Sequence, residues 1–241
     1  MTTNAKNKLI LALDVPNFDE ARQIIDKLGD SVEIYKVGYQ LFVAYGPFIV
    51  RYLQTQGKKV FLDLKFHDIP NTVANGVASA VGLSVPPHQT ESWAPLFMLT
   101  VHTQGGPEMM KAAADAAKKQ AETLKVTQPL IVGVTVLTSD AATGDTSKLV
   151  LERARQAKTA GLDGIVCSVQ EAAAVRRECG KDFVIVTPGI RPADSDVGDQ
   201  KRVETPAGAI KAGSSFLVVG RPIVKASDPK AAAQKILDEI A

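Results

Sequence analysis

The stretch "KVFLDLKFHDIP", residues 59 to 70, is a strand-like apolar run with charges placed inside it. Its valine, leucines and first phenylalanine are typical of a buried strand. Asp63 and Lys65 are two residues apart and therefore on the same face of that strand, and Asp68 follows just beyond it. Ionised groups are costly to bury unless they are paired or used in function. The run therefore predicts a strand whose C-terminal end carries a functional cluster of charged residues.

Similar short apolar runs recur along the chain, with amphipathic, helix-like stretches between them. Most are continuous rather than alternating, as in a parallel sheet that is covered on its outer face. Eight units in 241 residues give about 30 residues per unit, the spacing of βαβ crossovers. This favours an α/β fold of one domain over residues 1–241, a closed (β/α)8 TIM barrel rather than an open doubly wound sheet. The expected strands are 9–13, 33–37, 60–64, 97–101, 130–136, 164–167, 183–186 and 216–220, and the clearest helices are 18–29, 106–119, 147–161 and 228–241.

Charge and composition exclude several classes of protein. The 28 Lys and Arg nearly balance the 26 Asp and Glu, so no global field attracts nucleic acid or a membrane surface. The sequence shows no signal peptide and no long uncharged apolar run, which predicts a cytoplasmic protein without a membrane span. The turn after the first strand lacks a G-x-G-x-x-G or P-loop pattern, so dinucleotide binding has no support. Cys167 and Cys179 have no metal or redox spacing, and Cys167 fits packing in an apolar run.

The segment 82–96 breaks the regular alternation of strands and helices. It is rich in proline and polar residues and carries the only tryptophan, Trp93. We expect an extended loop on the surface before the fourth strand. The alternative is a role at a subunit interface, because an exposed tryptophan favours burial against a partner.

Polar residues gather at the ends of the expected strands. Active sites of such barrels lie at the C-terminal ends of the strands. Asp14 directly follows the first strand, Lys36 is near the end of the second, and Asp63 and Lys65 end the third. Structural ion pairs are the alternative interpretation, but four charges at the same end of adjacent strands favour a site. Further polar positions after strand ends are Asp68, His102, Thr138, the stretch 187–192 and the stretch 220–222.

The last strand predicts a phosphate site. Loops after the seventh and eighth strands of such barrels frequently bind phosphate. Gly220 allows close approach of the backbone, Arg221 offers a fork that suits phosphate oxygens, and Pro222 can open a short helix. The long polar segment 191–206 is expected to be a lid that brings Arg191 or Gln200 to the phosphate; an ordinary solvated loop is the alternative.

Several motifs together carry a family resemblance. They are "LALD", "YKVG", "FLDLKFHDIPNTV", "VTVLTS", "TPGIRP", "GDQKRVETP" and "VVGRPI". In this order and context, from about Leu9 to Ile240, the chain resembles the orotidine 5'-monophosphate decarboxylases, in particular the bacterial branch. The Asp63-x-Lys65-x-x-Asp68 core is shared with a wider group of phosphate-binding barrels, and the flanking "HDIPNT" and "TPGIRP" are more specific. The chain departs from the family pattern mainly at 82–96.

The resemblance implies the last step of uridine monophosphate biosynthesis, the decarboxylation of orotidine 5'-monophosphate. Lys65 would donate a proton to C6 of the pyrimidine after carbon dioxide leaves, within an alternating charged array with Asp63 and Lys36. The family builds its sites across a homodimer. The neighbouring subunit would therefore supply Asp68, Ile69 and Thr72.

The resemblance also implies a set of substrate contacts. Asp14 and Lys36 would hold the ribose hydroxyls, and His102 would lie nearby without a catalytic part. The remaining implied contacts are Thr138 to the pyrimidine, Pro188 beside it, and Arg191, Gln200, Gly220 and Arg221 to the 5'-phosphate.

The chemistry explains why charges are needed. Loss of carbon dioxide from C6 leaves a carbanion in the ring plane, where the π system delocalises it poorly. Many decarboxylases use pyridoxal phosphate, thiamine or a metal as an electron sink. The sequence offers no evident site for any of these, so we expect no metal and no cofactor. The remaining resource is electrostatic preorganisation around Lys65.

Two alternatives remain open. A magnesium-dependent sugar-phosphate decarboxylase, aldolase-type synthase or epimerase would need another acidic ligand, which the helix-like stretch after Asp68 does not supply. A non-catalytic sensor of phosphoribosyl ligands would use Arg221 and Gln200 but would have no need of Asp63, Lys65 and Asp68.

Overall fold

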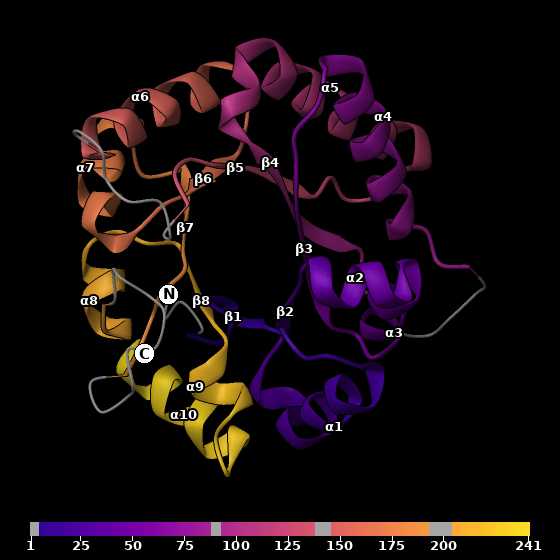
Figure 1. Cartoon of the computed structure of the whole chain (residues 1–241), viewed down its shortest axis with the longest axis vertical. Coiled ribbons are helices and arrows are strands. Elements are labelled where there is room, and N and C mark those ends of the chain that lie inside the picture. The colour runs from indigo at the N-terminus through magenta and orange to yellow at the C-terminus, as the bar shows by residue number, and fades with distance from the viewer. Residues whose placement is uncertain (1–4, 88–92, 138–145, 193–203) are drawn as a thin grey trace.

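The chain forms a closed barrel of eight parallel strands, each paired with its neighbours in sequence order and the eighth with the first (Figure 1). The computed structural model describes residues 5–87, 93–137, 146–192 and 204–241. The strands are β1 (Leu9–Ala12), β2 (Ile34–Val37), β3 (Lys59–Phe66), β4 (Leu96–His102), β5 (Leu130–Val134), β6 (Gly164–Val166), β7 (Val184–Thr187) and β8 (Phe216–Val219).

The helices form a ring around the outside of this barrel (Figure 1). Short 3-10 turns precede β1, follow α1 and α4, and follow β4. None of the helices in the described part of the chain has the length and apolarity that crossing a bilayer requires. The helices are α1 (Phe18–Leu28), α2 (Tyr39–Tyr45), α3 (Pro47–Thr55), α4 (Pro70–Val81), α5 (Gly106–Leu124), α6 (Thr146–Thr159), α7 (Val169–Cys179), α8 (Pro206–Lys211), α9 (Arg221–Val224) and α10 (Pro229–Glu239).

The predicted (β/α)8 barrel is confirmed, with small differences at the strand ends. β1 ends at Ala12, so Leu13 separates it from Asp14. β4 extends to His102, which was expected to follow that strand. β5 ends at Val134 and not at residue 136. Boundaries of this kind are set by where the ladder hydrogen bonds stop, which an apolar pattern reports only approximately.

The barrel interior is apolar in its lower layers and polar at its top. The inward-facing side chains include Ile34, Phe61 and Met98, which pack together and are buried. Side chains two residues further along a strand face the same way, toward the C-terminal end. On these strands the next inward positions after those three are Lys36, Asp63 and Thr100. Along each of these strands, the inward-facing side chains therefore change from apolar in the core to polar or charged at the mouth within two residues.

The outer faces of the strands pack on the helices. Leu9, Leu11, Tyr35 and Leu62, which alternate with the inward residues, belong to a second buried cluster shared with the helices. This two-sided burial accounts for the continuous apolar runs in the sequence.

The segment 82–96 is only partly described, because residues 88–92 lie outside the described ranges. It does not begin as an extended loop: Gly82–Ser84 form a 3-10 turn. Trp93 is half-buried, and its indole Nε1 donates a hydrogen bond to the Ser84 carbonyl at 2.8 Å. The expectation of an exposed tryptophan was therefore wrong, because this side chain packs back on its own chain.

Candidate active site

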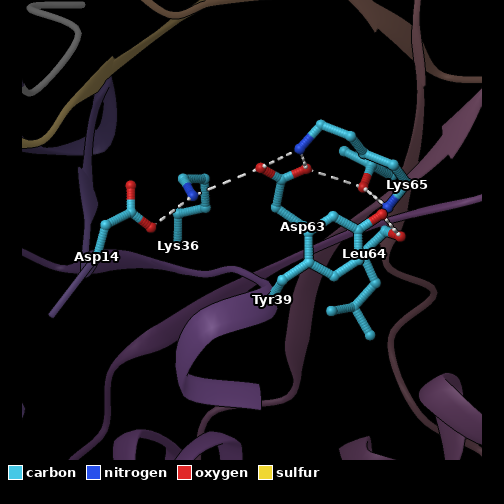
Figure 2. Close-up of polar contacts among 7 residues, drawn as sticks. Asp14, Lys36, Tyr39, Asp63, Leu64 and Lys65 are labelled. Carbon is cyan, nitrogen blue, oxygen red and sulfur yellow. Dashed lines mark hydrogen bonds and ion pairs between the residues drawn. The ribbon is translucent and has the colours of Figure 1, made fainter. Parts of the chain in front are cut away.

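Four charged side chains of alternating sign lie in a line across the C-terminal mouth of the barrel (Figure 2). The Lys36 ammonium is 3.1 Å from Asp14 Oδ1 and 3.5 Å from Asp63 Oδ2. The Lys65 ammonium is 3.0 Å from both carboxylate oxygens of Asp63. Gly38 leaves room for this line, because a Cβ there would lie 3.2 Å from the Lys36 ammonium nitrogen. The four residues that the sequence singled out are thus brought together.

Asp63 and Lys36 are the enclosed members of the line. Their side chains are 12% and 11% exposed, against 57% for Asp14. Burial alone would raise the pKa of Asp63, but the ammoniums of Lys36 and Lys65 and hydrogen bonds from Lys65 and Thr100 together lower it below the ordinary value. The carboxylate is therefore held in its charged form between two cations.

The mouth contains a two-lobed cavity. The apolar lobe, of about 250 Å³, has Asp63 and Lys65 on one wall. Its remaining walls are mainly aliphatic and aromatic: Phe61, Val134, Val136, Leu137, Val166, Cys167, Val186, Pro188 and Val218, with Lys36 at the edge. Such a lobe suits a flat heterocyclic ring, because apolar walls cover its faces while a few polar groups fix its orientation.

The polar lobe, of about 410 Å³, adjoins the apolar lobe, since Lys36, Pro188 and Val218 line both. It also contains Asp14, Arg191, Gly220 and Arg221, all predicted from the sequence. Its other lining residues are Ala12, Gly189, Val224 and Lys225. Besides Lys36, the cationic side chains of Arg191, Arg221 and Lys225 line this lobe, which suits an anionic group such as a phosphate.

The two arginines reach the polar lobe from different elements. Arg191 follows β7 and is buried, with its guanidinium donating to the Ile190 carbonyl at 2.9 Å. Its backbone N–H donates to the Glu204 carbonyl, which closes the base of the segment predicted to be a lid. Arg221 opens the short helix α9 directly after Gly220. The chain thus places both cations at the end of β7 and β8, as expected for a phosphate site.

Asp68, Ile69 and Thr72 do not line either lobe in this single chain. Asp68 is exposed, and its Oδ1 accepts a hydrogen bond from the Ile69 N–H at 2.6 Å. Ile69 is 65% exposed, and Thr72 is also on the surface. The three residues are therefore accessible to another molecule.

His102 lies beside the mouth but lines neither lobe. Its ring stacks on that of His67 at a centroid distance of 5.5 Å, and its Nδ1 accepts a hydrogen bond from the Gln104 N–H. A place near the site without a catalytic part stays the prediction for this residue. Two other expected contacts, Thr138 and Gln200, lie outside the described residues, as does most of the segment 191–206.

Sequence reasoning missed two side chains that contact the charge line. Thr100 of β4 donates to Asp63 Oδ1 at 3.0 Å, and Tyr39 of α2 donates to the Leu64 carbonyl at 2.8 Å. Thr100 left a signal, because it is a lone hydroxyl within the apolar run "FMLTV" on the inward face of its strand. Tyr39 left none that distinguishes it from an ordinary surface tyrosine.

The described residues contain no group of three or more His, Cys, Asp and Glu that could hold a metal ion. Cys167 lines the apolar lobe, but burial raises the pKa of its thiol, which keeps it in the unreactive protonated form. Packing is thus its main role, as predicted.

Comparison with known proteins gives a consistent set of relatives. A sequence family described as "Orotidine 5'-phosphate decarboxylase / HUMPS family" matches residues 7–236. The orotidine 5'-phosphate decarboxylase of Rhodopseudomonas palustris is 50% identical over 98% of this chain and 95% of its own length. That of Moorella thermoacetica is 46% identical over 98% of this chain and 93% of its own length.

Solved structures agree with the sequence relatives. The crystal structure of orotidine 5'-phosphate decarboxylase from Lactobacillus acidophilus superposes with a TM-score of 0.82 at 38% identity. The match covers 97% of this chain and 99% of that protein. Similarity over whole chains means that the barrel, the mouth and both lobes are compared together, and not one motif alone.

Proposed function

The chain belongs to the orotidine 5'-phosphate decarboxylase / HUMPS family, and we propose that it converts orotidine 5'-monophosphate to uridine 5'-monophosphate, the last step of pyrimidine nucleotide synthesis, at the mouth of its barrel. The observation that carries this proposal is the line Asp14, Lys36, Asp63 and Lys65 on the wall of a cavity with one apolar and one cationic lobe. A pyrimidine fits the first lobe, and a 5'-phosphate fits the second.

Lys65 is the residue that meets the reacting carbon. When carbon dioxide leaves C6, the electron pair remains on that carbon in the plane of the ring. An ammonium held against C6 stabilises this charge as it develops and then transfers a proton to the carbon, which completes the product. A unit-charge contact near 4 Å is worth about 4 kcal/mol at an effective dielectric constant of 20. The 3.0 Å contacts between Asp63 and Lys65 fix the direction of the ammonium.

The reaction needs no metal in this proposal. Both carboxylate oxygens of Asp63 are already within 3.5 Å of an ammonium, from Lys65 or Lys36. A divalent cation at Asp63 would be repelled by both lysines, so this carboxylate is a poor metal ligand. This charge pattern favours a decarboxylase over the magnesium-dependent sugar-phosphate enzymes.

Substrate binding divides between the two lobes. Asp14 and Lys36 hold the ribose hydroxyls where the lobes meet, and Pro188 lies along the ring. The 5'-phosphate is bound by Arg191, Arg221 and the backbone at Gly220, with Gln200 approaching from the segment 191–206 and Thr138 contacting the pyrimidine. Binding energy from the unreactive phosphate is then available for ordering the site around the reacting carbon.

The site is completed by a second copy of the chain. Asp68, Ile69 and Thr72 enter the neighbouring subunit's mouth, with Asp68 extending the alternating charge line beyond Lys65. The exposure of these residues supports this arrangement, as do the large exposed side chains Val43 and Phe48 on α2 and α3. Exposed apolar side chains on adjacent elements are typical of an interface.

Shared sites have a direct test. Lys65→Ala and Asp68→Ala homodimers, each nearly inactive, are mixed and allowed to exchange subunits. We expect about a quarter of wild-type activity, because half of the random dimers are mixed and each of those has one intact site. A mixture as inactive as its components would contradict sharing.

The activity itself is tested by the loss of orotidine 5'-monophosphate absorbance on adding purified protein, with and without EDTA. The proposal predicts stoichiometric uridine 5'-monophosphate and carbon dioxide, no effect of EDTA, and loss of turnover in Lys65→Ala. Turnover that requires added magnesium, or none with this substrate, would contradict the proposal and favour a sugar-phosphate reaction.

A further inference from the structure

Strand β3 leaves its regular pairing with β4 at the charge cluster. Leu62 is paired with Leu99, but the next paired residues are Phe66 and Val101, so Asp63, Leu64 and Lys65 lie opposite Thr100 alone. Lys65 also has a positive φ of 45°, a left-handed conformation that is unfavourable for a residue with a side chain. A bulge of this kind re-aims side chains, and it persists only where the surroundings hold it.

Thr100 holds the inner side of this bulge. It is fully buried, and its hydroxyl oxygen accepts a hydrogen bond from the Lys65 backbone N–H at 2.7 Å. The hydroxyl proton is then free to be donated to Asp63 Oδ1, which is 3.0 Å away. One side chain therefore replaces the missing ladder bond at Lys65 and orients the carboxylate that directs the Lys65 ammonium.

Tyr39 holds the outer side. Its phenol donates to the Leu64 carbonyl at 2.8 Å, and the Lys65 ammonium lies 5.7 Å from the centre of its ring (Figure 2). Burial, and then the nearby Asp63 charge, raise the pKa of Tyr39, so the phenol keeps its proton at neutral pH. The bulge is thus held on both sides by uncharged hydroxyl groups, Thr100 of β4 and Tyr39 of α2.

We propose that Thr100 and Tyr39 are positioning residues of the decarboxylation: they hold the bulged backbone of β3 so that Lys65 points at C6. This inference rests on the proposed function. Neither side chain needs to touch the reacting atoms. Without the Thr100 hydroxyl the Lys65 N–H loses its acceptor, and the backbone relaxes toward a common conformation that moves the ammonium. Misplacing a catalytic group by about 1 Å can cost about a hundredfold in rate.

The test compares Thr100→Val, which removes the hydroxyl at nearly constant shape, with Thr100→Ser, which restores it. Thr103→Val is the matched control, because Thr103 is also buried and donates to the Val134 carbonyl at 2.8 Å without contacting the bulge. For each protein kcat, KM, the affinity for uridine 5'-monophosphate and Tm are measured.

We expect Thr100→Val to lower kcat by about ten- to a hundredfold, while KM and the product affinity change by less than about threefold. Thr100→Ser and Thr103→Val should stay within about threefold of wild type in kcat. A purely structural role would instead change KM, product affinity and Tm together, and Thr100→Ser would be no more active than Thr100→Val. That pattern, or wild-type kcat in Thr100→Val, would overturn the inference.

If Thr100→Val does not fold, Tyr39→Phe tests the positioning role instead. Tyr39 is half exposed, and this change removes only the phenol hydroxyl that donates to the Leu64 carbonyl. A several-fold lower kcat at unchanged product affinity supports positioning, and an unchanged kcat contradicts it. Wild-type protein that does not decarboxylate orotidine 5'-monophosphate would refute the proposed function itself. If the wild type is active and the Thr100 and Tyr39 variants keep its kcat, only the positioning role is refuted.

Discussion

Asp63 and Asp163 are two carboxylates at opposite ends of the same barrel, and they have opposite surroundings. At the mouth, Asp63 contacts two ammoniums and faces a cavity. At the other end, directly before β6, Asp163 accepts a hydrogen bond from the Ile131 N–H at 2.7 Å, and its backbone bonds link β5 and β7. The Asp63 carboxylate thus faces a cavity, whereas the Asp163 carboxylate is bonded to the backbone of a neighbouring strand.

The difference appears in the pKa values of the two groups. The pKa of Asp63 lies below the ordinary value because its lysine neighbours outweigh burial. Burial raises the pKa of Asp163, and the Ile131 hydrogen bond only partly offsets it. Polar groups at the mouth are thus organised for charge, whereas those at the opposite end connect strands. In this fold the first arrangement is typical of catalysis and the second of stability.

The largest expected effect compares the same substitution at the two ends. Asp63→Asn should lower kcat by about a thousandfold or more, because it removes a unit-charge contact of about 4 kcal/mol that directs Lys65. Asp163→Asn should leave kcat/KM within about twofold, because it lies at the far end of the barrel. Steady-state kinetics of the two variants measure this. Similar losses in both would remove the functional distinction between the two ends.

A smaller effect is expected at the polar lobe. Arg221→Ala should lower kcat/KM by about a hundredfold, because it removes the proposed charge-assisted contact to the phosphate. Arg22→Ala is the matched control, since Arg22 is about half exposed and its nearest carboxylate is 4.0 Å away. A kcat/KM for Arg221→Ala as high as that of the control would contradict the phosphate assignment.

Arg176 tests the stabilising role of polar groups at the end of the barrel opposite the mouth. Its guanidinium donates to the carbonyls of Gly180, Phe183 and Gly213, among others, and so connects the loops before β7 and β8. Arg176→Met should lower the free energy of unfolding by about 2–4 kcal/mol, because several carbonyls, two of them in partly buried contacts, lose their donor at once. The expected kcat/KM below the melting transition is that of wild type.

Arg177→Met serves as the control for this change, because Arg177 is the exposed neighbour on the same helix. It should shift the free energy of unfolding by less than about 0.5 kcal/mol. Urea titrations of both variants provide the comparison. Equal stability of the two would show that the carbonyl contacts of Arg176 contribute nothing measurable.

The smallest expected effect is in the pH dependence of stability. Asp163 has a folded pKa above its unfolded value of about 3.9, so its contribution to stability is greatest below that pH and is lost as pH rises through the folded pKa. The stability of Asp163→Asn relative to wild type should therefore increase between pH 4 and pH 7. Denaturant titrations across this range measure the trend.

Asp63→Asn should show the opposite trend, in denaturant titrations below about pH 3.9 and not between pH 4 and pH 7. The folded pKa of Asp63 is lowered, so its contribution is present above about pH 3.9 and is lost as pH falls through the folded pKa. The same sign of pH dependence for both variants would contradict the contrast between the two carboxylates.

Most of the barrel was predictable because each unit repeats one pattern. Continuous apolar runs gave the strands, and the polar residues at their ends gave the mouth. Asp14, Lys36, Asp63 and Lys65 could be grouped because parallel strands bring their C-terminal ends together.

Other features depend on three-dimensional detail. The bulge at Lys65 and its positive φ follow from the register between β3 and β4, which no apolar pattern specifies. Tyr39 contributes through a backbone carbonyl, so its sequence context is uninformative. Trp93 was expected to be exposed because its segment is polar, yet its indole is half-buried and donates a hydrogen bond to the Ser84 carbonyl.

The most direct test of the account is the activity and melting temperature of Lys65→Gly beside Lys65→Ala. If Lys65 is held in a left-handed conformation for chemistry, both variants lose activity by more than about a thousandfold, and glycine melts about 2–4 °C above alanine because it relieves about 1 kcal/mol of strain. If Lys65→Gly melts below Lys65→Ala, or if it retains activity, the claim that Lys65 is held in a strained conformation for catalysis is contradicted.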